Sequence, residues 1–252
     1  ACGYEGAGRL ADPGIIVAEV ERALGAGDLA GEKVLVTAGP NREPIDPVRF
    51  ISNRSTGRMG YALAAAAWRR GAEVVLVSGP VALPVPHGVR CERVTTAAEM
   101  RDAVRREIDA TSMLFMAAAV ADYRPAKVAA KKLKKTDGPM RLELERTVDI
   151  LAELRATPGE RLTVGFAAET DDVLRNAERK LAAKGLDLIV ANDVSRADAG
   201  FEVDTNAVTL IDAGGRTEVP LASKDDVADR ILDRALALKR GRRQGRRSAR
   251  KA

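Results

Sequence analysis

Residues 33–60 read KVLVTAGPNREPIDPVRFISNRSTGRMG, and this stretch indicates the fold class. Its first apolar run, residues 34–36, is followed by a Gly-Pro turn, which is typical of a buried strand. An alanine-rich helix closed by a glycine is expected over residues 61–70, and residues 74–77 are a second apolar run. A strand, a helix and a strand in this order form a βαβ unit, so we expect a parallel sheet.

The same alternation continues along the chain. Helices are expected over residues 97–108 and 171–184, and strands over residues 113–119, 162–166 and 186–191. A hairpin is expected over residues 207–220, and Ser223 opens a last helix that should end near Lys239. The sequence therefore predicts the α/β class, with a Rossmann-like, doubly wound, mostly parallel sheet and a C-terminal β-hairpin extension.

The composition excludes several classes of protein. Among 252 residues, 46% are hydrophobic but only 3% are aromatic, so aliphatic side chains must form the core. Cys2 and Cys91 are too few for a disulfide framework or a zinc site, and the single histidine, His87, excludes His-dependent triads. No run approaches the roughly 18 apolar residues of a membrane span, and signal-peptide features are missing, so we expect a cytoplasmic protein that binds no membrane.

We expect three segments: a linker over residues 1–31, one folded domain over residues 32–240, and a disordered basic tail over residues 241–252. The stretch from Lys239 onward holds eight Lys or Arg and no acid, so the rest of the chain carries 5 − 8 = −3 charges. Such tails are typical of solubilising ends, and binding to nucleic acid is the alternative. The acidic body and the few aromatic rings argue against a nucleic-acid partner.

The segment over residues 37–60 lies at the carboxyl end of a strand, where open α/β sheets bind ligands. Its glycines would let backbone N–H groups approach a phosphate. Neither G-x-G-x-x-G nor G-x-x-x-x-G-K-[ST] occurs in the chain, so the standard nucleotide motifs are absent. A purely structural loop is the alternative, but loops of this length without regular structure are uncommon unless they have a function.

Two further strand ends carry candidate residues. At residues 117–125, small side chains would let a flat ring lie against the backbone. Asp122 could hold a ribose, a base edge or a hydrated divalent ion there, or else pair locally with Arg124. At the end of the later strand, Phe166 is either a core residue or a platform on which a base stacks.

Two groups of lysines are candidates for binding phosphate. Residues 131–135 hold four lysines, and Lys180 and Lys184 lie four residues apart on a predicted helix, where like charges repel. A charge run is usually a solvated surface. Together, however, the two groups could neutralise a triphosphate without a phosphate-binding glycine loop.

Residues 36–60 closely resemble the opening of the bacterial phosphopantothenate–cysteine ligases, also called phosphopantothenoylcysteine synthetases. The likeness continues through residues 117–125, the lysine cluster and residues 165–170 and 187–195. It implies that the carboxylate of 4′-phosphopantothenate attacks the α-phosphate of CTP, which gives an acyl-cytidylate and pyrophosphate. The amine of L-cysteine then displaces CMP. The resemblance also implies Mg²⁺ or Mn²⁺ with CTP, and a homodimer.

The resemblance assigns roles by position. The expected catalytic residues are Asn53 and Lys132. Asn53 would hold the acyl-cytidylate for the cysteine step, and Lys132 is tied to the activation step. The residues expected to bind the substrate are Arg49, Asn53 and Ala119. The expected CTP-binding residues are Met116, Ala117, Ala118, Asp122, Lys132, Phe166, Lys180 and Lys184, and no metal ligand is assigned. Residues 146–150 read Arg-Thr-Val-Asp-Ile where many members of the resembled family have Lys-Asn-Pro-Asp-Ile. This difference leaves open whether the side chains of Thr147 and Val148 contact the cytosine or the ribose.

Residues 1–10 resemble the last motif of the flavin-dependent decarboxylase that is fused upstream in bacterial bifunctional proteins. Cys2 matches its proton-donating cysteine, but without the rest of that domain we expect no flavin site and an inert Cys2. On this resemblance, residues 1–31 are a remnant of a decarboxylase domain and a linker from it, and that domain would be a fused partner in the parent protein.

Other functions are open on the residues alone. A Rossmann-type NAD(P)-dependent reductase is the alternative, although the missing glycine motif argues against it. ATP could replace CTP, because no residue type selects cytosine. If the chain is a ligase, removing the residues after Lys239 should leave turnover unchanged.

Overall fold

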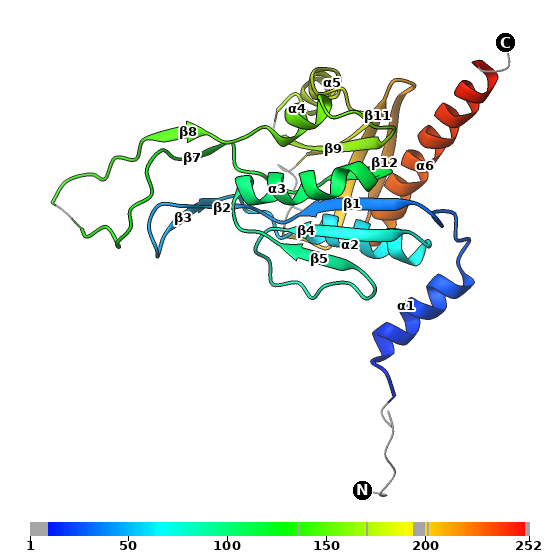
Figure 1. Cartoon of the computed structure of the whole chain (residues 1–252), viewed down its shortest axis with the longest axis horizontal. Coiled ribbons are helices and arrows are strands. Elements are labelled where there is room, and N and C mark those ends of the chain that lie inside the picture. Colours follow the sequence, from blue (N-terminus) through cyan, green and yellow to red (C-terminus); the bar gives the residue numbers. More distant parts are fainter. Residues whose placement is uncertain (1–9, 136, 170, 194–199, 201, 250–252) are drawn as a thin grey trace, which may run out of the picture.

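The structure is a computed structural model that describes residues 10–135, 137–169, 171–193, 200 and 202–249. Its centre is an eight-stranded sheet in the order β12-β11-β10-β9-β6-β1-β4-β5 (Figure 1). Six of its strands are mutually parallel: β1 (Lys33–Ala38), β4 (Glu73–Ser78), β5 (Arg90–Arg93), β6 (Met113–Met116), β9 (Leu162–Glu169) and β10 (Leu188–Asp193). The strands β11 (Thr205–Asp212) and β12 (Gly215–Ser223) add the antiparallel hairpin. The predicted fold class is confirmed.

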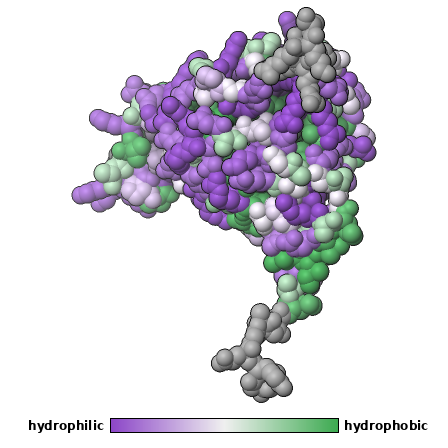
Figure 2. Space-filling model, turned by 45° about the vertical axis from the view of Figure 1, so that its right-hand side comes forward, coloured by the Kyte–Doolittle hydropathy of each residue, from purple (hydrophilic) through white to green (hydrophobic). Residues whose placement is uncertain are grey.

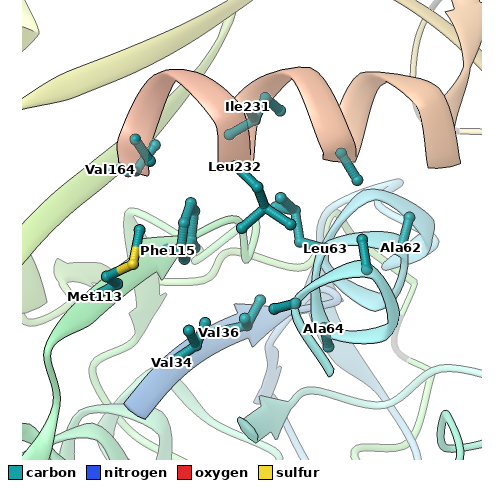
Figure 3. Close-up of a cluster of buried hydrophobic side chains, with 14 of the residues drawn as sticks. Val34, Val36, Ala62, Leu63, Ala64, Met113, Phe115, Val164, Ile231 and Leu232 are labelled. Atoms are coloured by element: carbon teal, nitrogen blue, oxygen red, sulfur yellow. The ribbon is translucent and has the colours of Figure 1, made fainter. Parts of the chain in front are cut away.

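Helices cover both faces of the sheet. Buried side chains of α2 (Arg58–Arg69) and α6 (Lys224–Ala249) pack on the face that includes Val34, Val36 and Phe115 (Figure 3). The other face, which includes Leu35, packs against α3 (Ala97–Glu107), α4 (Ile150–Arg155) and α5 (Val173–Lys184). Successive residues of a strand point to opposite faces, so the unbroken apolar run of β1 is the signature of a strand buried on both sides. A short 3₁₀ helix (Ile108–Ala110) follows α3.

Two small hairpins extend from the carboxyl edge of the sheet and were not predicted. The first joins β2 (Arg42–Pro44) to β3 (Phe50–Ser52), and the second joins β7 (Tyr123–Pro125) to β8 (Leu144–Arg146). We call residues 123–146 the arm, because Figure 1 shows it projecting away from the sheet. These strands are three residues long and mostly exposed, so they give no clear apolar alternation, which explains why the sequence pattern missed them.

The last helix is longer than predicted. It was expected to end near Lys239, with a disordered tail from residue 241, but α6 continues to Ala249. Glu32, next to the start of β1, pairs with Lys239 and lies 3.2 Å from Arg243, and Asp187 pairs with Arg242. Acidic groups at the amino edge of the sheet thus hold the first basic residues of the supposed tail, which extends the helix.

The first helix, α1 (Pro13–Leu24), is attached by its polar side chains. Arg22 donates hydrogen bonds to the carbonyl groups of Trp68 and Gly71 at the end of α2 and lies over the Trp68 ring, and Glu19 binds His87 at 2.7 Å. The apolar side chains of α1 remain largely exposed, including Val17, Val20 and Leu24. Figure 2 shows them as a green surface beside the grey N-terminal residues.

No helix in the described part of the chain has both the length and the apolar character needed to cross a membrane.

Candidate functional site

The carboxyl ends of β1, β6 and β9 form the floor of the candidate site. Thr37 pairs with Met116, and Met116 pairs with Gly165, so the three strand ends lie side by side. The sheet therefore brings Met116 next to the strand that carries Phe166, and Ala117, Ala118 and Ala119 follow directly after β6. β6 ends at Met116 and not at Ala119, because the Ala118 N–H turns to the hydroxyl of Thr37 at 3.2 Å.

Two glycines allow the backbone to fold tightly over this floor. Gly39 follows β1 with φ of 76°, and Gly57 precedes α2 with φ of 80°. A Cβ on Gly57 would lie 3.2 Å from the Gly39 nitrogen, so the two turns are in contact. The Ala119 N–H donates to the Gly39 carbonyl at 2.9 Å, which joins the β1 turn to the β6 turn.

Asn53 lies beside this junction. Its Nδ2 donates a hydrogen bond of 3.0 Å to the carbonyl of Ala119, and its side chain is exposed. Two residues that sequence reasoning assigned to the same substrate thus come together from segments 66 positions apart. Its Oδ1 accepts no hydrogen bond from the described residues and can accept one from a ligand.

Arg49 is held by a neighbour that the sequence analysis did not single out. Asp46 accepts hydrogen bonds from Arg49 Nε at 3.0 Å and from Nη2 at 2.5 Å. The hydrogen bond from the Arg49 guanidinium holds the pKa of the Asp46 carboxyl well below its usual range. Burial raises this pKa, but backbone N–H groups also lower it. The signal in the sequence was an Asp and an Arg three residues apart beside Pro47, which is typical of a tight turn.

The two lysine groups lie in different parts of the chain. Lys132 is on the arm, exposed, whereas Lys180 donates to the Phe166 carbonyl at 2.7 Å and Lys184 pairs with Asp149. Figure 1 shows the outer end of the arm projecting away from α5, and Leu133 of the arm is bound by Asp46 and Arg49 of the β2–β3 turn. A single chain therefore does not bring the lysines of residues 131–135 together with Lys180 and Lys184 over one triphosphate.

Phe166 is partly buried and packs against the core, so its ring has a structural role. Its carbonyl accepts a hydrogen bond from Lys180, and this bond fixes α5 to the floor of the site. Asp149 is the second residue that sequence reasoning missed: it caps α4 through the Ala152 N–H at 3.0 Å. Burial raises its pKa, but the hydrogen bond from Lys184 and the cap outweigh burial and lower the pKa below the usual value.

Asp122 does not pair with Arg124. Arg124 binds Glu145 across the arm at 2.7 Å, and the Asp122 side chain is exposed at the rim of the site. Thr147 donates its hydroxyl to the Ala121 carbonyl and its N–H to the Asp122 carbonyl. Thr147 therefore supports the backbone next to Asp122.

The described residues contain no group of three or more His, Cys, Asp or Glu side chains that could hold a metal ion. Magnesium commonly binds through one or two carboxylates together with phosphate oxygens and water. The exposed carboxylate of Asp122 is compatible with that mode, and a cage made only of protein ligands is not present in this part of the chain.

The chain is similar to proteins of coenzyme A metabolism. The coenzyme A biosynthesis bifunctional protein CoaBC of Bacillus subtilis is 52% identical over 243 residues, which cover 94% of this chain and 60% of that protein. The crystal structure of the C-terminal domain of a coenzyme A biosynthesis bifunctional protein CoaBC has a TM-score of 0.73 and 42% identity, and the match covers 84% of this chain and 98% of that domain.

A structure described as a Cab2 mutant in complex with phosphopantothenate–cysteine has a TM-score of 0.72, with coverage of 91% of this chain and 94% of that chain. At 17% identity it shows the likeness of the fold alone. The chain spans about three fifths of the length of its Bacillus subtilis relative. The model of the DNA/pantothenate metabolism flavoprotein C-terminal domain matches residues 29–238, and the chain belongs to that family.

Proposed function

We propose that this chain is a phosphopantothenate–cysteine ligase that acts through an acyl-cytidylate. The observation that carries the proposal is the contact of Asn53 with Ala119 over the carboxyl ends of β1 and β6, with Arg49 on the adjacent hairpin. An amide, an arginine and a backbone shelf suit the positioning of an anionic substrate. The one histidine of the chain, His87, is bound to Glu19 and packs edge-on to Trp68.

The chemistry needs alignment and charge stabilisation more than proton transfer. A carboxylate oxygen of 4′-phosphopantothenate attacks the α-phosphorus of CTP and pyrophosphate leaves. The cysteine nitrogen then attacks the acyl carbon, CMP leaves, and the amine loses a proton. Asn53 would orient the acyl-cytidylate, Lys132, Lys180 and Lys184 would offset phosphate charge, and Asp122 would bind the ribose. Bound Mg²⁺ or Mn²⁺ would neutralise part of the triphosphate charge.

We also propose a homodimer, in which the arm of one chain reaches the α5 lysines of its partner. The separation of Lys132 from Lys180 and Lys184 within one chain supports this arrangement. A decarboxylase domain fused to this chain in the parent protein, and the cytoplasm as the compartment, are part of the same proposal. The bifunctional name of the Bacillus subtilis relative supports the fused domain.

The test is release of pyrophosphate from CTP and 4′-phosphopantothenate with Mg²⁺, measured with and without L-cysteine. We expect cysteine-dependent turnover, and we expect ATP to support less of it. Asn53→Ala should stall at the acyl-cytidylate, visible as a labelled intermediate, and the isosteric Asn53→Asp separates loss of the amide donor from loss of shape. No pyrophosphate with either nucleotide would exclude the ligase.

A further inference from the structure

Asp46 makes more contacts than its place in a turn requires. Its side chain is fully buried. Oδ1 accepts the N–H groups of Val48 at 2.8 Å and Arg49 at 2.9 Å, which closes the turn between β2 and β3. Oδ2 accepts the Arg49 guanidinium and also the N–H of Leu133 at 3.1 Å, 87 positions further along the chain. One carboxylate therefore joins the hairpin to the arm.

Arg49 completes the same connection. Its Nη2 donates to the carbonyl of Leu133 at 2.8 Å, so both backbone groups of Leu133 are bound, one by Asp46 and one by Arg49. A further backbone hydrogen bond of 3.0 Å runs from Ala129 to Ile45. The residue before Leu133 is Lys132, which is exposed. The peptide bond that follows Lys132 is thus fixed to the β2–β3 turn.

The contacts leave one end of the guanidinium available. Nε and Nη2 of Arg49 are engaged, and Nη1 makes no hydrogen bond in the described parts of the chain. The Arg49 side chain is 39% exposed, so Nη1 can reach an anionic group from solvent. A guanidinium held by a carboxylate on one side presents a fixed direction for a phosphate or carboxylate on the other.

We propose that Asp46 is a positioning residue that fixes Arg49 and the Lys132–Leu133 peptide as one unit, so that the anionic end of the substrate meets both cations in a set geometry. The role of the unit in binding 4′-phosphopantothenate rests on the proposed function. The connection of the hairpin to the arm does not, and it can be measured without substrate.

The first measurement is limited proteolysis with trypsin, followed by mass spectrometry of the fragments. Trypsin cleaves after lysine and therefore at the Lys132–Leu133 bond. The N–H of Leu133 is bound by Asp46, and the carbonyl of Leu133 is bound by Arg49. We expect Asp46→Ala to speed cleavage at this bond by about tenfold or more, because cleavage requires local opening of the backbone. Asp46→Asn keeps one side-chain oxygen as an acceptor, so its cleavage rate at this bond should lie between the rates of wild type and Asp46→Ala. The matched control is Asp233→Asn, which removes one carboxylate of a 2.8 Å pair between Asp233 on α6 and Arg70 at the end of α2.

The second measurement separates positioning from general damage. We expect Asp46→Asn to raise the KM for 4′-phosphopantothenate by about tenfold, with the KM for L-cysteine nearly unchanged. An equal rise for both substrates, or faster cleavage with an unchanged KM for 4′-phosphopantothenate, would overturn the positioning role. Unchanged cleavage would overturn the connection itself. Faster cleavage in a chain whose wild type has no ligase activity would keep the connection and reject the proposed function.

Discussion

At the scale of single residues, Gly60 shows how closely α2 approaches the strand that leads into the site. A Cβ at this position would lie 2.5 Å from the Cβ of Ala38 and 3.0 Å from the Thr37 carbonyl. We expect Gly60→Ala to lower the free energy of unfolding by about 2 kcal/mol, because the helix must move away from β1. Thermal unfolding would check this, with Gly241→Ala as the control, since a methyl group there meets nothing within 4 Å. Equal melting temperatures for both variants would contradict it.

Sequence reasoning grouped two residues that the structure brings together. Asn53 and Ala119 were assigned to one substrate and are in contact. Asp46 and Asp149 were missed, because their contacts with Leu133 and Lys184 join segments distant in sequence, although the spacing of Asp46 and Arg49 was visible. No local periodicity reports such pairs. Of the two roles left open for Asp122, local pairing with Arg124 is not seen, because Arg124 pairs with its cross-strand neighbour Glu145.

At the scale of elements, the attachment of α6 depends on a buried charge. Glu32 accepts hydrogen bonds from Lys239 and Ser112, and both side chains of the ion pair are only 8% exposed. Removing one partner leaves an uncompensated charge, so we expect Glu32→Gln to lower the free energy of unfolding by about 3 kcal/mol at neutral pH. Denaturant unfolding would measure it. Glu73→Gln, which breaks the exposed pair with Lys33, should change it by less than about 0.5 kcal/mol.

The same carboxylate gives a pH dependence. Burial raises the pKa of Glu32, but the hydrogen bonds of Lys239 and Ser112 and the charges of Lys239 and Arg243 lower it below the usual value of 4.5. A lowered pKa in the folded state stabilises the protein above the pKa of the unfolded state, and this contribution is lost as the pH falls through the folded-state pKa. We expect the difference in stability between wild type and Glu32→Gln to shrink below pH 4.5. A difference that stays constant through the acid range would argue against the pair.

Truncation of α6 tests where the folded domain ends. A chain ending at Gly245 keeps the contacts of Arg242 and Arg243 and should melt as the full chain does. A chain ending at Lys239 loses both contacts, and we expect a lower melting temperature with turnover retained below that temperature. Sequence composition ended the last helix too early, because basic residues among Gly, Gln and Ser look alike whether or not acidic groups face them.

At the scale of the whole molecule, the separation of Lys132 from Lys180 leads to a complementation experiment. If the site is built from two chains, a mixture of Lys132→Ala and Lys180→Ala subunits contains dimers with one intact site. We expect an equal mixture, after subunit exchange, to recover about a quarter of the wild-type activity. Each variant alone should be nearly inactive. A mixture no more active than its parts would place the complete site within one chain.

The docking of α1 also gives the protein an internal optical probe. Trp68 is the one tryptophan of the chain, and its indole lies 4.6 Å from the Arg22 guanidinium and at the edge of the His87 ring. It stands at the end of α2, at the opposite edge of the sheet from Asn53. Its fluorescence emission therefore follows the attachment of α1 and is insensitive to nucleotide at the far edge. Displacement of α1, by a neighbouring domain or by any other surface that covers its apolar side, could be followed in the unlabelled protein.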